Sequence, residues 1–506
     1  MKRLERTGKL FGFLRVYRSE LFDEVFQAEL AKMYPQPNSG KEPLPPAMLA
    51  MVVLLQAYTG TSDAEAVELS VVDLRWQMVL DCLGTEKPAF SQGALQAFRE
   101  RLIKHDMDRS LLERTAELAR KTKGFDATKL PRALAIDSSP LEGAGRVEDT
   151  INLIAHAARK VVECAALLLD IEYQEVCKEA GIPLLLESSP KKALDRDWAN
   201  PKEKARAIED LMAQVFALQG WVDEHLTTES TTPPLSEKLQ TLQDVIDQDL
   251  EPDPKGGIKI KKGVAKERRI SITDSQMRHG RKSKNRPING YKRHLAIDLD
   301  SGVIAACAVT PANRPEEEAT PDLERDLARQ ELKISELYID RGYTDSSISL
   351  EVQAQGGQVV CRPRSAHNFG LYTKDDFDID LTEKTVRCPA GIVIPIRRRD
   401  NTVRFPAHEC NSCPQKKGCT SDKNDKGRCI TIAPDEAFQQ KLKTFVVTPE
   451  GRQKLRRRTS VEHKLARLVR GQGRKARYVG CRKNLADIRR HAAVMNLELI
   501  QREKAA

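Results

Sequence analysis

The sequence predicts an α/β core, with a mixed five-stranded sheet flanked by helices, joined to an all-α N-terminal domain and interrupted by two insertions. Three observations support this fold class. Short apolar, β-prone runs alternate with helical segments between residues 290 and 361, a similar run stands alone near residue 134, and long helical stretches separate the two. A chain of 506 residues also exceeds one hydrophobic core, which agrees with several domains.

Residues 1–125 predict a helical N-terminal domain. PLPPAMLAMVVLLQAYTG opens with prolines that favour a helix start and closes on Gly60, which can end the helix. Ser62 and Ser91 are N-cap candidates for further helices. A plain helical bundle and a domain that binds DNA ends both fit, and no helix-turn-helix spacing stands out.

The predicted core comes in two pieces. Residues 126–146 hold the first strand, RALAID, and residues 147–265 return to helical composition and end with the linker EPDPKGG. The core resumes over 266–364 with a turn signal at Asp300–Gly302. Its expected elements are strands at GYKRHLAIDL, GVIAACAVT, ELYID and QVVCR, and helices at PEEEATPDLERDLARQ and 344–355.

Two aspartates stand at the ends of apolar strands. Asp137 follows LAI in the first piece, and Asp340 follows LYI in the second. The strand and helix order is that of a ribonuclease-H-like fold, in which the first and fourth strands are central neighbours. We therefore expect Asp137 and Asp340 to meet despite about 200 intervening residues. Capping of the next helix is the simpler alternative, whereas Asp298 and Asp274 fit hairpin and linker positions.

A third acid is predicted on a late helix. In RRRTSVEHKLARLVRGQGR, Val461, Leu465 and Leu468 mark an amphipathic helix. Glu462 lies beside this apolar seam, and Arg458 precedes it by one turn. In isolation the pair is explained by a helix salt bridge.

The charge of the chain is concentrated at one end. The net charge is +10, yet residues 451–506 alone hold 17 Lys and Arg against 4 Asp and Glu, an excess of +13. This block suits polyanion binding or a solvated helical surface. No run approaches the ~20 apolar residues of a membrane span, and no signal peptide is evident. We expect a cytoplasmic protein without membrane contact.

Five of the 11 cysteines lie in a small insertion, residues 365–450, and four of these form the predicted cluster. The candidate zinc ligands are Cys388, Cys410, Cys413 and Cys419, and His408 or Cys429 could replace one of them. A CxxC pair with two further thiols is typical of a structural zinc site, because four thiolates leave no open position for substrate. Unmetallated thiols in a loop are the alternative.

Taken together, the motifs resemble those of bacterial insertion-sequence transposases of the DDE class, in the subgroup with a cysteine-bearing insertion. AIDSSPLEGAG is similar to the first-acid motif, YIDRGY to the Asp-x-Gly-Tyr second-acid motif, and RTSVEHKLARL to the third-acid helix with its preceding Arg. PPAMLAMVVLLQAYTGTSDAEAVELSVVDLRWQMVL and TPAN resemble the helical domain and a central strand end. The chain departs at Leu455, where relatives often carry Tyr, and at Val469, where they often carry Lys.

The resemblance implies a DNA cleavage and strand-transfer enzyme. Asp137, Asp340 and Glu462 would hold two Mg²⁺ ions, with Asp137 bridging them, because Mg²⁺ prefers oxygen ligands. Arg458 and Arg470 would contact DNA, which comprises the element ends and the target. A homodimer in the active complex and a bacterial, nucleoid-associated location are also expected. A ribonuclease-H-like nuclease without strand transfer and an inactive DNA-binding descendant are the alternatives.

Overall fold

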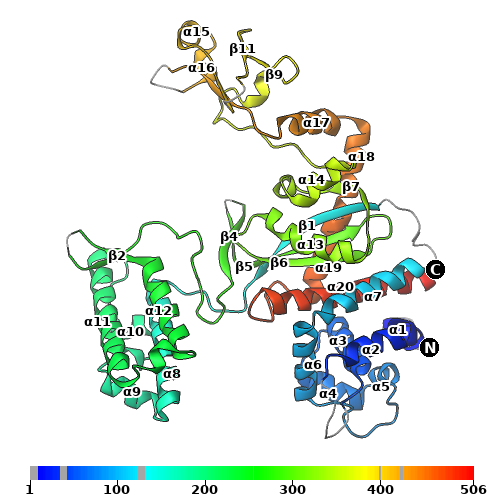
Figure 1. Ribbon diagram of the computed structural model, residues 1–506, viewed down its shortest axis with the longest axis vertical. Helices are drawn as coiled ribbons and strands as arrows, with labels where there is room; N and C mark the ends of the chain where they lie inside the picture. Colours follow the sequence, from blue (N-terminus) through cyan, green and yellow to red (C-terminus); the bar gives the residue numbers. More distant parts are fainter. Residues whose placement is uncertain are drawn as a thin grey trace.

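The computed structural model describes residues 9–34, 43–122, 132–254, 256–283, 285–397, 401–421 and 426–505. The boundary expected between residues 125 and 126 lies outside these ranges. Figure 1 shows a central sheet with the N-terminal helices below it, a helical insertion to one side, and a small cysteine-rich unit at the far end. None of the described helices is both long and apolar enough to cross a membrane.

The N-terminal segment is helical, as predicted. Its helices are α1 (Lys9–Leu21), α2 (Glu24–Ala31), α3 (Pro46–Thr59), α4 (Asp63–Val72), α5 (Leu74–Leu80), α6 (Gln92–Lys104) and α7 (Met107–Lys121). Gly60 ends α3 in the left-handed region, with φ of 75°. Ser62 forms a capping box with Glu65, and Ser91 accepts a hydrogen bond from the backbone of Ala94. These three predicted helix signals are confirmed.

The core sheet has six strands, so the prediction of five was wrong. Its strands are β1 (Arg132–Glu142), β4 (Arg278–Ser283), β5 (Arg286–Asp298), β6 (Ile304–Pro311), β7 (Ile334–Tyr338) and β8 (Gln358–Val360). The order is β4-β5-β1-β7-β8, with β6 also paired to β5. The additional strand, β4, arises because β5 extends beyond β6 and pairs there with a polar, basic segment. β1 and β7 are parallel neighbours, as expected for the first and fourth strands of the predicted core.

Helices cover both faces of the sheet. On one face, α13 (Thr320–Arg329) and α14 (Ser347–Ala354) form a cluster with strand residues such as Leu134 and Leu337. On the other face lie α19 (Thr459–Gln472) and α20 (Cys481–Ala505). α17 (Glu436–Val446) and α18 (Pro449–Arg457) lead from the cysteine-rich unit back to α19.

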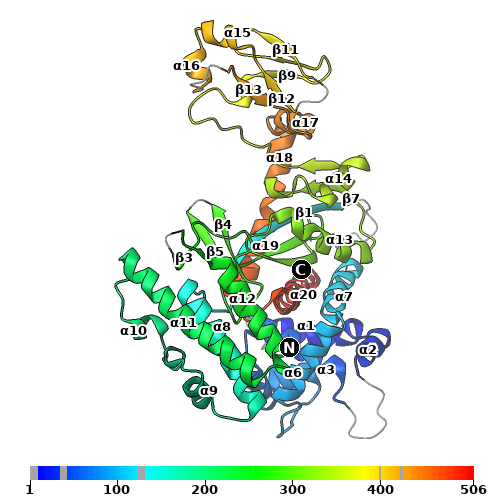
Figure 2. The ribbon, with the colours of Figure 1, turned by 60° about the vertical axis from the view of Figure 1, so that its left-hand side comes forward.

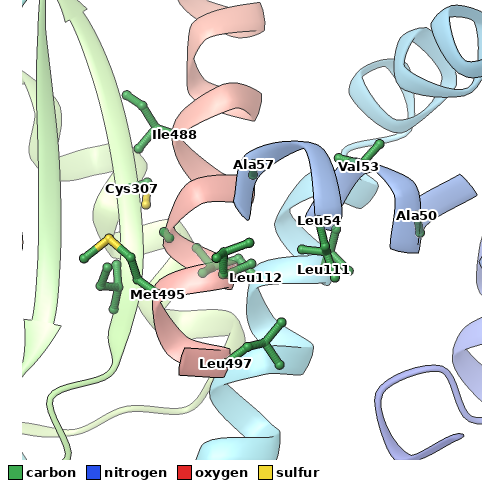
Figure 3. Packing of buried hydrophobic residues seen from close by; sticks show 14 of the residues in the cluster. Ala50, Val53, Leu54, Ala57, Leu111, Leu112, Cys307, Ile488, Met495 and Leu497 are labelled. Carbon is green, nitrogen blue, oxygen red and sulfur yellow. The ribbon is translucent and has the colours of Figure 1, made fainter. Parts of the chain in front are cut away.

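The long helix α20 lies between the sheet and the N-terminal helices (Figures 1 and 3). Figure 3 shows Ile488, Met495 and Leu497 among residues of α3, α7 and β6. Asn496 is fully buried, accepts from the backbone N–H of Ile304 at 2.8 Å, and donates to its carbonyl at 3.0 Å. One hydrophobic cluster therefore joins the N-terminal helices to the sheet through α20.

A buried ionic network strengthens the same junction. Arg489 of α20 is 1% exposed and donates to Asp108 and to Asp326, both at 3.0 Å. Arg109 also pairs with Asp326. Because a buried guanidinium is tolerated only with well-placed carboxylates, this network specifies how α7, α13 and α20 fit together.

The two insertions have cores of their own. The helical insertion contains α8 (Thr150–Leu169), α9 (Tyr173–Glu179), α10 (Pro190–Leu194), α11 (Pro201–His225) and α12 (Leu235–Asp249). Its expected linker, EPDPKGG, is in part a β-hairpin, β2 (Leu250–Pro252) and β3 (Ile258–Ile260), because Gly256 and Gly257 adopt the positive φ of a turn. The cysteine-rich unit contains β9 (Asp378–Asp380), β10 (Thr385–Arg387), β11 (Val393–Pro395), β12 (Thr402–Arg404), α15 (Ala407–Ser412), α16 (Lys416–Cys419) and β13 (Cys429–Thr431). Figure 2 shows the two insertions well separated.

Candidate active site

Asp137 and Asp340 lie on neighbouring parallel strands. Ala135 of β1 is in register with Tyr338 of β7, so each aspartate is two residues beyond a paired position. Asp137 accepts a hydrogen bond from the backbone of Ser138 at 2.8 Å. Asp340 caps the short 3₁₀ helix Arg341–Tyr343 and accepts from the backbone of Arg341 at 2.9 Å. The backbone donors therefore hold Asp137 in the middle of β1 and Asp340 just beyond the carboxyl end of β7. The predicted strand end at Asp137 was wrong, because β1 continues to Glu142 by pairing with β5.

Glu462 of α19, and Arg458 at the junction of α18 and α19, lie beside Asp137. The apolar seam predicted for this helix, Val461, Leu465 and Leu468, is buried. Arg458 donates to Glu462 at 2.8 Å, and its other terminal nitrogen lies 3.7 Å from the Asp137 carboxylate. Arg458 thus interacts with both Asp137 and Glu462. The spacing alone predicted only the helix salt bridge to Glu462.

All three predicted acids line one open cavity of about 800 Å³, called here the acid cavity. Its charged residues are Asp137, Arg281, Lys282, Lys292, Glu316, Glu317, Asp340, Arg458 and Glu462. The remaining wall is formed by β1 residues after Asp137 and by the seam side of α19, including Leu465, Ala466 and Val469. Carboxylates from distant parts of the chain therefore share a solvent-accessible space with four cationic side chains.

Burial perturbs the titration of Asp137. Desolvation raises the pKa of this carboxyl to about 6, and the negative charges of Asp340 and Glu316 act in the same direction. The Ser138 backbone donor and Arg458 oppose the rise. A cation that enters the cavity would therefore stabilise the ionised form of Asp137.

Glu316 is a further acid at the site that the sequence interpretation missed. Its carboxylate accepts a hydrogen bond from the Ser138 hydroxyl at 2.5 Å, next to the first acid. A Cβ atom on Gly342 would lie 2.4 Å from the Glu316 carboxylate, so a side chain at this position would make that carboxylate move. The sequence signal was weak, because Glu316 is one of three consecutive glutamates in a segment that predicted an ordinary helix start.

A buried, uncharged pair of side chains, Tyr343 and His294, stabilises the segment that follows Asp340. Tyr343, the tyrosine of the Asp-x-Gly-Tyr motif, is buried, and its hydroxyl lies 2.7 Å from Nδ1 of His294. Nε2 of His294 lies 3.0 Å from the Thr310 hydroxyl. Complete burial lowers the pKa of His294 to about 3, so the imidazole is neutral at physiological pH. This pair is a structural support for the DRGY segment, because no solvent reaches it.

Arg470 lies apart from these residues. It lines a second cavity together with Tyr58, Arg467 and His491. Eight residues along a helix rotate the side chain by about 80°, because each residue advances 100°. The residue seven positions after Glu462, Val469, is the one that lines the acid cavity.

Asp298 and Asp274 have structural partners. Asp298 lies 3.4 Å from Arg132 and accepts from the Ser301 hydroxyl at 2.8 Å within the β5–β6 turn. Asp274 accepts a hydrogen bond from the buried hydroxyl of Tyr291. Neither lines the acid cavity.

The acid cavity suits hard divalent cations in its donor chemistry. It offers carboxylate oxygens from β1, from Asp340 just after β7, from the 3₁₀ segment at Glu316 and from α19. Within the described ranges, no three His, Cys, Asp or Glu side chains already stand in a metal-holding arrangement. Arg458 occupies the space between two of the acids, and its buried Nη1 lacks a hydrogen-bond partner.

The four predicted cysteine ligands surround a small cavity of about 30 Å³ in the cysteine-rich unit. Cys388, Cys410, Cys413 and Cys419 all line it, and the pKa of Cys419 is raised by burial and by the neighbouring thiols. The Arg428 backbone donates to the Cys410 sulfur at 3.4 Å. Of the two alternative ligands, His408 is 81% exposed, and neither it nor Cys429 lines the cavity. All 11 cysteines are free thiols.

Two family models match the chain. Residues 265–497 match the family described as "Transposase DDE domain", and residues 9–101 match that described as "Transposase domain (DUF772)". The first match begins after the helical insertion, so Asp137 lies outside it. Neither the curated proteins nor the solved structures that were compared gave a match. With a DDE domain on a ribonuclease-H-like core and a transposase N-terminal domain, the chain belongs to the insertion-sequence transposases of the DDE class.

Proposed function

We propose that this transposase cuts DNA at the ends of its own element in a Mg²⁺-dependent reaction and joins them to target DNA. The observation that carries the proposal is the acid cavity, in which Asp137, Asp340 and Glu462 converge from elements far apart in the sequence. Three acids at one open site are costly without cations. Their convergence is therefore better explained by metal-dependent chemistry than by folding.

The chain's own groups have distinct roles in this proposal. Asp137, Asp340 and Glu462 would hold the cations, which would supply activation of water or a 3′-hydroxyl and stabilisation of the leaving oxygen. Arg458, released from Glu462, donates its unpartnered Nη1 to the phosphate being cut. Arg470, outside the cavity, contacts DNA further along. The N-terminal helices, residues 1–125, bind the element end.

Cleavage and joining are tested separately. Purified protein is incubated with labelled duplexes from the flanks of its gene and Mg²⁺, with Asp340→Asn and Glu462→Gln as inactive variants and Asp298→Asn as a matched control. We expect cleavage by wild type and by the control only. Pre-cut ends and a supercoiled plasmid then test strand transfer. Cleavage without joined products would favour the nuclease, and DNA binding without either would favour an inactive descendant.

We also propose that the cysteine-rich unit, residues 365–450, holds one structural Zn²⁺ through Cys388, Cys410, Cys413 and Cys419. The support is their common cavity and the unit's small hydrophobic cluster. A unit with so little apolar core gains stability from a metal. Metal analysis of protein prepared without added zinc would give about one ion per chain, whereas a value near zero in active protein would contradict the assignment.

We assign the other segments of the chain to the same function. The core pieces 126–146 and 266–364, the helical insertion 147–265 and the C-terminal helices 451–506 act as one catalytic body. Two element ends must be joined in one event, so we propose a homodimer on DNA, in the bacterial cytoplasm at the nucleoid. Light scattering of the protein with and without paired ends measures the assembly.

A further inference from the structure

The hairpin formed by β4 and the start of β5 carries a concentrated positive charge at the edge of the acid cavity. Arg281, Lys282 and Arg286 are all exposed on it, and the first two line the cavity. Figure 1 shows β4 on the side of the sheet towards the helical insertion. The transposase chemistry described above assigns no role to these side chains.

A bulge turns two consecutive cations to the same side. Arg281 pairs with Pro287 and Ser283 pairs with Arg286, so the register shifts at Lys282, the extra residue. In a regular strand, successive side chains point to opposite faces. A bulge re-aims a side chain, and here both Arg281 and Lys282 line the acid cavity.

The base of the hairpin is held firmly. A Cβ atom on Gly280 would lie 2.1 Å from the Ala312 carbonyl, so the strand packs directly on the backbone after β6. His279 Nδ1 lies 2.7 Å from the Asn289 side-chain oxygen across the hairpin, and Ile288 is buried. The cations therefore extend from a positioned support.

These cations have no acidic partner within the described part of the chain. A half-buried arginine nearby is paired, since Arg314 contacts Glu267 and Glu318. Arg281, Lys282 and Arg286 make no ion pair with a described residue, although five acids line the adjoining cavity. Unpaired cations beside an acidic site attract a DNA phosphate, which the acids alone would repel.

We propose that this hairpin is a DNA-backbone clamp, in which Arg281, Lys282 and Arg286 grip phosphates next to the one being cut. The inference rests on the proposed function for its substrate. It adds a binding surface separate from the basic C-terminal block. Contacts of this kind fix the position of the duplex and carry no sequence information.

The test is the salt dependence of DNA binding by a triple variant, Arg281→Gln, Lys282→Gln and Arg286→Gln. Binding of a fluorescent gene-flank duplex is measured without Mg²⁺, so cleavage plays no part. We expect the slope of log affinity against log salt to become shallower by roughly two to three, at about 0.9 per phosphate contact. A scrambled duplex would show the same change.

The matched control loses the same charge elsewhere. Lys178→Gln, Lys202→Gln and Lys204→Gln lie on exposed positions of the helical insertion and should leave the slope near that of wild type. Arg281→Lys with Arg286→Lys, which keeps the charge, should restore the slope and show that the hairpin still folds. An unchanged slope in the triple variant, or an equal change in the control, would overturn the clamp. Failure of wild type to cleave, with the slopes as expected, would refute only the proposed chemistry.

Discussion

Asp137→Asn should stabilise the metal-free protein while it removes cleavage. The native pKa of Asp137 is about 6, against an ordinary value of 3.8. At neutral pH the difference corresponds to up to about 3 kcal/mol that the folded state loses by burying this charge. Asparagine keeps the side-chain volume and can still accept from the Ser138 backbone, so the substitution removes the charge without opening a cavity.

The pH dependence follows from the sign of the shift. Below about pH 3 the carboxyl is protonated in both the folded and the unfolded chain, and the two proteins should have equal stability. As the pH rises towards about 6, the Asp137 carboxyl of the unfolded chain is already ionised. The same carboxyl in the folded chain ionises only near pH 6, because burial disfavours its charge. The advantage of the variant should therefore appear between these values and be complete by about pH 8.

The assay must report on the core itself. The three tryptophans, Trp76, Trp198 and Trp221, lie in α5 and in the helical insertion, so tryptophan fluorescence would follow other parts of the molecule. Hydrogen exchange of the β1 and β7 amides reports local opening directly. At about pH 8 and without metal, their protection should rise by up to about a hundredfold in Asp137→Asn, which corresponds to the 3 kcal/mol.

Asp298→Asn in the same sheet is the matched control. Its carboxylate pairs with the buried Arg132, so neutralising it should lower the protection of the same strands. Mg²⁺ should raise protection in wild type and leave Asp137→Asn nearly unchanged. If Asp137→Asn were no more protected than wild type at high pH, the carboxylate would be well solvated in the native state and the argument from burial would be refuted.

Three further outcomes are expected. Arg458→Ala should weaken DNA binding by roughly one phosphate contact in the salt slope and lower cleavage, whereas identical slopes would leave Arg458 as a partner of the third acid. Cys413→Ser should release zinc and melt the cysteine-rich unit at a lower temperature, measured by metal analysis and calorimetry, and unchanged zinc content would exclude this ligand. Arg489→Met should destabilise the junction of α20 by about 3–5 kcal/mol, because Asp108 and Asp326 lose their buried cation. Hydrogen exchange of the α7 amides measures this destabilisation. Protection equal to that of the wild type would show that the buried ionic network contributes little to stability.

Much of the core could be predicted because its strands follow simple rules. LAI and LYI are short apolar runs that precede an acid, and they pair as parallel neighbours. The prediction that Asp137 and Asp340 lie near each other is therefore confirmed by the cavity that both residues line. The α19 seam likewise follows helical periodicity.

The missed features lack a periodic signal. β4 has the sequence RHGRKS, whose polarity hides a strand that only pairing with the end of β5 creates. Glu316 reaches the site through a hydrogen bond to Ser138, a contact 178 residues apart in the chain that no local pattern encodes. Arg458 and Arg470 are both predicted to contact DNA, yet Arg470 lies eight residues after Glu462, is rotated by about 80° from it and lines another cavity.

The position of α20 has a consequence for synthesis. This helix fills the space between β6 and the N-terminal helices, and Asn496 joins β6 to Thr115 of α7. While the ribosome is still translating, the nascent chain has its strands and its first helices but not the element that unites them. The nuclease can therefore be assembled only after residue 500 or so has left the exit tunnel, and fragments released early would expose β6 and α7 to proteases and chaperones.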